Sequence, residues 1–186
     1  MNVILASGSP RRRQILEQVG IHPEIIVSNA DETVTGAPDA QVKELALRKA
    51  NAVLPLVDTT SSENLIIIAA DTLVFINNEV LGKPETPGEA FKMLKKLQGT
   101  THHVYTGVAL LKGGGESHVF ADMAEVTFRP LSDAEINAYI ETGEPFDKAG
   151  AYGIQERGAT LVDRINGDFY TVMGLPISKV YPLLTS

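Results

Sequence analysis

Short, fully apolar runs alternate along the chain with stretches in which every third or fourth position is apolar. The apolar runs at residues 3–6 and 25–27 predict short strands. Between them we expect a helix that begins at Pro10, is capped by Ser9 and ends at Gly20. Its apolar stripe consists of Ile15, Leu16 and Val19. The chain therefore opens with a predicted strand, helix and strand.

The most apolar segment of the chain is residues 65–70, which contains no polar residue. Such a run is typical of a strand that is covered on both faces, as in a sheet sandwiched between helices. An amphipathic helix is predicted over residues 39–53, and polar loops are predicted at residues 29–32 and 58–64. The helix residues expected to face the core are Val42, Leu45, Ala46, Ala50 and Val53.

Turn and capping signals divide the middle of the chain. Residues 73–81 predict a hairpin that turns at an Asn-Asn pair. Two capping boxes, in which Thr86 pairs with Glu89 and Ser132 with Glu135, each open a predicted helix. These helices are expected to end at Gly99 and Gly143.

The remaining apolar segments predict further strands and a last helix. Strands are expected at residues 104–111 and 119–128. A second hairpin is predicted from residues 159–165 to residues 169–172, across an Asn-Gly turn. A final helix should follow Pro176.

Strands and helices interleave throughout, so the predicted fold class is α/β, with a mixed, twisted sheet flanked by helices. The chain has 186 residues and no internal repeat or long linker, which favours one domain over residues 1–186, undivided or in two tight lobes. No apolar run is long enough to span a bilayer, and residues 3–6 are too short for a signal peptide. We therefore expect a cytoplasmic protein without a membrane partner.

Charge and composition exclude several classes of function. The chain has 16 Lys and Arg against 23 Asp and Glu, a net charge of −7, whereas broad nucleic-acid binding needs a basic face. It has no cysteine, so disulfides, thiolate metal sites and cysteine nucleophiles are excluded. The histidines show no metal-binding pattern, because the adjacent His102 and His103 would point to opposite faces of a strand.

Three consecutive arginines, Arg11 to Arg13, stand in the first turn of the first predicted helix, just after the turn that contains Ser7. Cations are unfavourable there unless an anion binds, because the start of a helix is already positive. The alternative is a solvated basic patch, which suits Arg13 because Glu17 lies one turn further on. Arg12 lies in line with the inward stripe, so we assign an anion site to Arg11 and Arg12.

Lys49 is the next candidate, because it lies on the same helical stripe as Val42, Ala46 and Val53. A buried lysine needs a partner. Its ammonium either extends along the helix to the surface or makes a second contact to phosphate beside the arginines.

Two carboxylates are expected just after strands. Asp71 directly follows residues 65–70, and Glu32 follows residues 25–27. Ligands of α/β sheets gather beyond the carboxyl ends of the strands. There the two carboxylates could hold one Mg²⁺ together with phosphate oxygens and water, and Asp71 could activate a water molecule. The alternative for Asp71 is a turn-forming residue.

Two later segments combine glycine with polar residues. Lys83, in the sequence Gly-Lys-Pro, is either an exposed loop lysine or a ligand contact. Residues 147–155 include small residues that let a backbone approach a ligand, and Gln155 offers the donor and the acceptor that reading a nucleobase edge requires. A tight turn with structural glycines explains this segment equally well.

The order of these motifs resembles the Maf family of nucleotide pyrophosphatases. The matching segments are residues 5–12 (LASGSPRR), 70–72 (ADT), 81–84 (LGKP), 147–155 (DKAGAYGIQ) and 174–176 (GLP). The resemblance covers nearly the whole chain. It implies an α/β fold with two lobes around a deep cleft, and cleavage between the α- and β-phosphates of a nucleoside triphosphate. It also implies a divalent metal, Mg²⁺ or Mn²⁺, as cofactor.

The resemblance also implies roles for individual residues. Asp71 corresponds to the general base and, with Glu32, to the metal-site carboxylates. The polar and phosphate-contacting positions correspond to Ser7, Arg11, Arg12, Lys49 and Lys83. The positions that separate the subfamilies are Arg12, Thr72 and Gln155, and they resemble the branch that prefers dTTP and UTP. Glu156 departs from the family, where a small residue such as glycine is expected.

The expected activity is therefore hydrolysis of dTTP and UTP to the monophosphate and pyrophosphate, by metal-assisted attack of water on the α-phosphorus. One alternative is a pyrophosphatase for 7-methylguanosine triphosphate or another modified nucleotide. Another is a nucleotide sensor that does not hydrolyse and acts on cell division. We expect no stable nucleic-acid partner, and a homodimer is possible.

Overall fold

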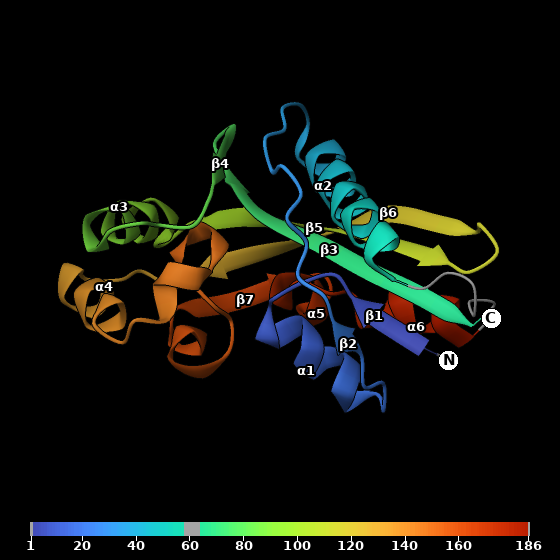
Figure 1. Ribbon diagram of the computed structural model, residues 1–186. Coiled ribbons are helices and arrows are strands. Elements are labelled where there is room, and N and C mark those ends of the chain that lie inside the picture. The colour runs from blue at the N-terminus through green and yellow to red at the C-terminus, as the bar shows by residue number, and fades with distance from the viewer. Residues whose placement is uncertain (1, 58–63, 186) are drawn as a thin grey trace. The chain divides into compact units, whose positions relative to one another are not determined.

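The computed structural model describes residues 2–57 and 64–185, and Figure 1 shows the arrangement of the elements. The strands are β1 (Asn2–Leu5), β2 (Glu24–Ile25), β3 (Leu65–Ile76), β4 (Glu79–Leu81), β5 (Thr101–Lys112), β6 (Ser117–Phe128) and β7 (Val162–Asn166). The α-helices are α1 (Pro10–Gln18), α2 (Pro38–Val53), α3 (Pro87–Leu97), α4 (Asp133–Ile140), α5 (Phe169–Met173) and α6 (Ile177–Thr185). Short 3₁₀ helices are η1 (Leu54–Leu56), η3 (Glu144–Asp147), η4 (Ala149–Ala151) and η5 (Glu156–Thr160). The predicted loop of residues 58–64 lies outside the described residues, apart from Asn64.

The described strands form a mixed sheet of seven strands. Its order is β2-β1-β3-β5-β6-β7, and β4 pairs with β3 off this path. Strand β1 runs parallel to β2 and β3, whereas β4 and β7 run antiparallel to β3 and β6. The predicted α/β class, with a mixed sheet flanked by helices, is confirmed. Among the described residues, no helix is both long and apolar enough to cross a membrane.

The chain divides into two compact units. The first unit consists of the described residues of Met1–Asp71, Thr106–Asp122 and Met173–Ser186. The second unit consists of Thr72–Tyr105 and Met123–Val172. The chain passes from one unit to the other within β3, β5, β6 and α5. The single domain with a deep cleft between two lobes stays a prediction.

In the first unit, β3 is covered on both faces. Ile67 and Ala69 pack with Ala46 and Ala50 of α2 in one apolar cluster. The alternate residues of the same strand point to the opposite face, and all of residues 65–70 are buried, as their unbroken apolar run predicts. Figure 1 shows α2 above β3, with α1 below β1.

Helix α2 lies directly on β5 at Gly107. A Cβ atom at this position would lie 2.1 Å from the carbonyl oxygen of Val42, so any side chain there would collide with the helix backbone. Glycine therefore allows backbone to pack on backbone, and this contact fixes how closely α2 approaches the sheet. The later turns of α2 carry Lys49, so Gly107 also helps to position that residue.

The second unit has an apolar core of its own. Leu94 of α3, Ile136 of α4 and Phe128 of β6 belong to one cluster that also includes Tyr152. The fully buried ring of His102 lies edge-on to Phe128 and Tyr152, with centroid distances of 5.1 and 5.3 Å. This core supports the segment that contains Gln155, because Tyr152 lies three residues before it in the chain.

The second predicted hairpin is wrong in its second half. Residues 169–172 form the start of α5 instead of a strand. The carboxylate of Asp168 accepts a hydrogen bond from the N–H of Tyr170 at 2.8 Å, and its carbonyl accepts one from Thr171 at 3.1 Å. A local cap at Asp168 therefore overrides the strand preference of the aromatic and β-branched residues that follow.

Three smaller expectations also need correction. Ser9 is the N-cap residue of α1, but its side chain makes no capping bond. Instead the N–H of Ser9 donates to the hydroxyl of Ser7 at 3.2 Å. Val19 is exposed, and β2 spans Glu24–Ile25 instead of residues 25–27. The remaining predicted helices and strands are present, several of them longer than expected.

Candidate functional site

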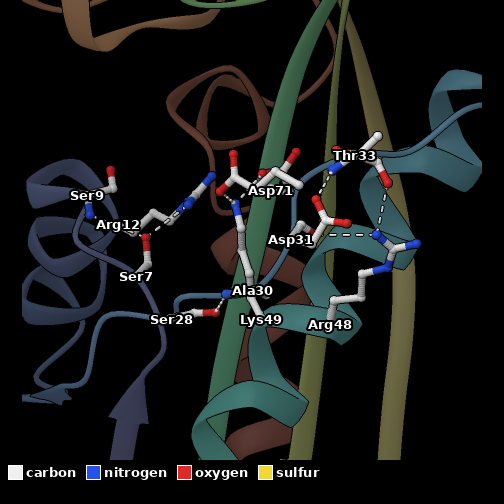
Figure 2. Close-up of polar contacts among 11 residues, drawn as sticks. Ser7, Ser9, Arg12, Ser28, Ala30, Asp31, Thr33, Arg48, Lys49 and Asp71 are labelled. Carbon is white, nitrogen blue, oxygen red and sulfur yellow. Dashed lines mark hydrogen bonds and ion pairs between the residues drawn. The ribbon is translucent and has the colours of Figure 1, made fainter.

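The first polar cluster begins where β1 ends. Ser7 is buried, and its hydroxyl accepts a hydrogen bond from Nη1 of Arg12 at 2.9 Å. Nε of Arg12 donates to the carbonyl oxygen of Gly174 at 2.8 Å. The guanidinium thus joins the start of α1 to the turn before α6, two segments of the first unit that are far apart in the sequence. Figure 2 shows the guanidinium extending toward Asp71.

The neighbours of Arg12 explain its electrostatics. Burial lowers the pKa of Arg12 from its ordinary value, and the negative charge of Asp71 opposes this effect. The positive charge of Arg11 lowers the same pKa further, whereas Glu32 raises it. Arg12 therefore lies in the field of both carboxylates that the sequence singled out.

The arginine triplet divides as the sequence predicts. Nε of Arg13 pairs with Glu17 at 2.7 Å on the exposed face of α1, with 58% of the Arg13 side chain accessible. Arg11 and Arg12 are both half-buried. The solvated reading holds for Arg13, and Arg11 and Arg12 remain the candidates for an anion.

Lys49 links two carboxylates at the centre of the cluster. Its Nζ lies 2.6 Å from Oδ1 of Asp71 and 2.8 Å from Oε1 of Glu32. The side chains of Lys49 and Asp71 are 13% and 14% exposed, whereas that of Glu32 is 64% exposed. Of the two alternatives for Lys49, an ammonium that extends to the surface is wrong, because Nζ pairs with Asp71 and Glu32 and the side chain is 13% exposed.

Asp71 lies within a strand, not directly after one as the sequence suggested. Strand β3 continues to Ile76, because its later residues pair with β4. The neighbouring strand β1 ends earlier, with its last pairing between Leu5 and Ile68. Asp71 thus lies beyond the carboxyl end of the parallel strand β1, which is the general position that favours ligand binding.

An arginine outside the triplet, Arg48, holds the loop that carries Glu32, and sequence reasoning missed it. Nη1 of Arg48 donates to the carbonyl oxygens of Asp31 and Thr33 at 3.3 and 2.9 Å, and Nη2 pairs with Glu44. The N–H of Thr33 donates to the Asp31 carboxylate at 2.9 Å. Figure 2 shows Arg48 beside the loop. The four-residue spacing from Glu44 could have predicted the ion pair, but nothing local predicts the loop contact.

The first cluster suits a hard divalent cation that is completed by substrate. Within the described parts of the chain, no group of three or more His, Cys, Asp or Glu side chains could hold a metal. Two carboxylates nevertheless converge on one ammonium. Mg²⁺ commonly binds one or two carboxylates and takes its other ligands from phosphates and water. Asp71 and Glu32 therefore fit such an ion.

The two later motifs meet in the second unit. The carbonyl oxygen of Gly82 accepts a hydrogen bond from the N–H of Gly150 at 3.0 Å, which joins the Gly-Lys-Pro loop to residues 147–155. Lys83 is exposed and Pro84 is buried. The structure thus brings together two segments that the sequence separates by more than sixty residues.

Backbone amides fix the segment around Gln155. The hydroxyl of Tyr139 accepts from the N–H of Gly153 at 3.1 Å. The carboxylate of Glu144 accepts from the N–H groups of Arg157 and Gly158 at 3.3 and 3.2 Å. Half-buried Gln155 lies between these anchored positions, so its backbone is held on both sides.

Comparison with known proteins identifies the family. The family described as Maf-like protein matches residues 2–186. The chain belongs to the Maf family. A dTTP/UTP pyrophosphatase of Aquifex aeolicus (strain VF5) is 48% identical over 187 residues, covering 99% of this chain and 94% of that protein. One of Bacillus thuringiensis subsp. konkukian (strain 97-27) is 46% identical over 180 residues, covering 96% and 91%. The structure of the Staphylococcus aureus Ham1 protein matches 69% of this chain and 72% of its own, with a TM-score of 0.49 and 16% identity.

The residues that the resemblance assigns to the site divide between the two units. The first unit contains Ser7, Arg11, Arg12, Glu32, Lys49 and Asp71. The second unit contains Thr72, Lys83 and Gln155, with Thr72 half-buried directly after Asp71. Glu156, the departure from the Maf pattern, has a positive φ of 54°. Glycine adopts this conformation at little cost, so the backbone itself explains why a glycine is expected there.

Proposed function

We propose that this protein is a nucleoside triphosphate pyrophosphatase that converts dTTP and UTP to the monophosphate and pyrophosphate. The observation that carries the proposal is the cluster of Arg12, Lys49, Asp71 and Glu32 at the carboxyl end of β1. It combines cations for polyphosphate with carboxylates for a metal and for water. The names of the full-length relatives support the same reaction.

Asp71 and Glu32 would hold Mg²⁺ or Mn²⁺, which offsets the charge of the triphosphate and polarises its oxygens. Asp71 orients a water molecule and accepts its proton. The water oxygen forms a new bond to the α-phosphorus, while the bond from that phosphorus to the bridging α,β-oxygen breaks. The bridging oxygen leaves with pyrophosphate, so the products are the monophosphate and pyrophosphate.

Cationic side chains would stabilise the charge that develops on the leaving group. We assign this role to Arg11, Lys49 and Lys83, with Ser7 as a polar contact. Arg12, Thr72 and Gln155 would recognise the pyrimidine. Gln155 is suited to this task because its amide both donates and accepts, and because its backbone is anchored on either side.

The proposed function is tested by separating products after incubation with dTTP, UTP and 7-methylguanosine triphosphate, with Mg²⁺ or with EDTA. We expect pyrophosphate from dTTP and UTP with Mg²⁺, and none with EDTA. Asp71→Asn should fold normally and lose about 10²- to 10⁴-fold in kcat, the range for general-base catalysis. Asp122→Asn is the matched control and should keep its activity, because Asp122 is also 14% exposed and paired with a lysine, Lys179.

Three outcomes would contradict the proposal. Near-normal dTTP hydrolysis by Asp71→Asn would exclude its role as the base. Binding of dTTP without release of pyrophosphate would favour a nucleotide sensor. Faster cleavage of 7-methylguanosine triphosphate would move the protein to another substrate class. A cytoplasmic location and a homodimer are part of the proposal, to be checked by fractionation and by sedimentation.

A further inference from the structure

One ammonium group occupies the position where the two proposed metal ligands converge. Nζ of Lys49 contacts Oδ1 of Asp71 at 2.6 Å and Oε1 of Glu32 at 2.8 Å. We propose that Lys49 is an exchangeable counter-ion: it neutralises both carboxylates in the free enzyme, gives way to the divalent cation, and then contacts substrate phosphates. This inference rests on the proposed function for the identity of the metal ligands.

Nζ of Lys49 lies between the two oxygens that a bridging divalent ion would use. An ion bound by both Oδ1 of Asp71 and Oε1 of Glu32 would therefore take the position that the ammonium now holds. An ammonium and a divalent cation also repel each other at short range. Entry of the metal therefore requires Lys49 to move away from at least one carboxylate.

The burial of Asp71 explains why a counter-ion is needed before a metal binds. Asp71 is 14% exposed, and a carboxylate with so little solvent is costly to keep without a partner. The charge of Arg12 also interacts with Asp71, and the Arg12 guanidinium donates to Ser7 and Gly174. Lys49 thus offsets the charge of Asp71 and holds Glu32 and Asp71 close together.

The two partners of Lys49 differ in exposure and in the element that carries them. Glu32 is 64% exposed and lies on a loop whose carbonyl groups are held by Arg48. Asp71 lies within β3. The exposed carboxylate is the one that an incoming cation meets first, while the loop backbone stays in place. Lys49 then needs only a side-chain rotation to leave its partners.

This exchange couples the metal to the substrate. A substrate phosphate that accepts a hydrogen bond from the released ammonium makes the free energy of metal binding more favourable. By reciprocity, a bound metal makes the Lys49 ammonium available to phosphate. The exchange also accounts for a residue that the family resemblance assigns to phosphate yet that contacts carboxylates here.

The main experiment measures Mn²⁺ binding without nucleotide, by titration calorimetry and by the electron paramagnetic resonance signal of free Mn²⁺. Lys49→Met removes the competing cation, and we expect it to bind Mn²⁺ about tenfold more tightly than the wild type, the equivalent of one charge-assisted hydrogen bond. Lys43→Met is the matched control, because Lys43 lies on the same helix and pairs with exposed Asp39. Its Mn²⁺ affinity should equal that of the wild type.

Unchanged or weaker Mn²⁺ binding by Lys49→Met would overturn the proposal, as would the absence of binding in both proteins. A second measurement uses the wild type, in case Lys49→Met does not fold. The nitrogen-15 resonance of the Lys49 ammonium, assigned with Lys49→Arg, should shift when Mg²⁺ is added, while that of Lys43 should not. A Lys49 resonance that is insensitive to saturating Mg²⁺ contradicts the exchange.

These results are separable from the test of the proposed function. If dTTP is hydrolysed and Mn²⁺ affinity is the same with and without Lys49, the exchange fails and the pyrophosphatase assignment stands. If Lys49 and metal compete but no triphosphate is cleaved, the exchange stands and the assignment fails.

Discussion

The polar clusters of the two units depend on different kinds of interaction. In the first unit, charged side chains contact one another: Arg12 lies beside Asp71, and Lys49 pairs with Asp71 and Glu32. In the second unit, backbone amides carry the structure, with Tyr139 and Glu144 accepting N–H groups from the segment around Gln155. One cluster depends on charge balance, the other on burial and backbone geometry.

This difference teaches what each cluster is able to do. Opposite charges that neutralise one another can be exchanged for a metal or a phosphate, so the first cluster is adapted to charged ligands. Anchored amides resist movement and hold the backbone on both sides of Gln155 in place, which suits recognition of a neutral base. The predictions below test this contrast, beginning with the largest expected effect on the free energy of unfolding.

The second unit should show a pH dependence that arises from burial. Burial lowers the pKa of His102 from 6.5 to about 4. The unfolded chain therefore binds a proton between these values while the folded chain does not, so stability falls as pH falls from 6.5 to 4. The expected loss is about 3 kcal/mol, measured by urea unfolding across this range. His102→Phe should remove this part of the dependence of the free energy of unfolding on pH. The control is His118→Gln, which removes a histidine paired with exposed Glu116 and should keep the dependence. An unchanged slope in His102→Phe would show that burial of this imidazole is not its cause.

In the first unit, the guanidinium of Arg12 should contribute more to the free energy of unfolding than that of Arg13, the exposed arginine next to it. Arg12→Met removes one hydrogen-bond donor from the hydroxyl of Ser7 and one from the carbonyl of Gly174. We expect a loss of about 2 kcal/mol in the free energy of unfolding, because hydrogen bonds from a charged group are strong. Urea unfolding at neutral pH measures it. A cost below that of a surface arginine would mean that these contacts do not stabilise the unit.

Removing the charge of Glu144 should loosen the backbone around Gln155. The amides of Arg157 and Gly158 would face a neutral acceptor in Glu144→Gln. We expect a loss of about 1 kcal/mol in stability, and a rise of about fivefold in KM for dTTP with kcat nearly unchanged. Glu141→Gln, at an exposed position in the same region, is the control. A fall in kcat with constant KM would place Glu144 in the chemical step and weaken the contrast between the units.

The smallest effect should come from the exposed arginine of the triplet. Arg13 pairs with Glu17 on the surface of α1. Arg13→Ala should cost about 0.3 kcal/mol, decreasing with added salt, because exposed ion pairs are screened. Hydrolysis of dTTP should be unchanged. A large loss of activity would extend the anion site to the whole triplet.

Most elements follow from local pattern because their signals are strong and near in sequence. The apolar run of residues 65–70 predicts a buried strand, and the stripe from Val42 to Val53 predicts α2. The Ser132 and Glu135 pair forms the complete capping box expected at α4. Thr86 also caps α3, but Glu89 accepts the N–H of Glu85 instead of closing the box.

The errors occur where a neighbouring segment or a single polar residue decides the conformation. Residues 169–172 have strand-like composition, yet Asp168 caps them as a helix. The strand predicted over residues 65–70 continues through Asp71 to Ile76, where it pairs with β4. The hydrophobic pattern predicts the hairpin of residues 73–81, but it does not show that residues 65–70 run into this hairpin without a break.

The sequence by itself determined the element types, the family resemblance and the residues worth testing, because periodicity, caps and motifs are local properties. Tertiary structure decided which of these residues meet. The pairing of Lys49 with Asp71 and Glu32, and the bond from Arg12 to Gly174, join segments that are distant in the chain. Such contacts depend on how α2 packs on the sheet at Gly107 and on where β1 ends. Those distances are set by packing of the whole unit, which no stretch of sequence encodes alone.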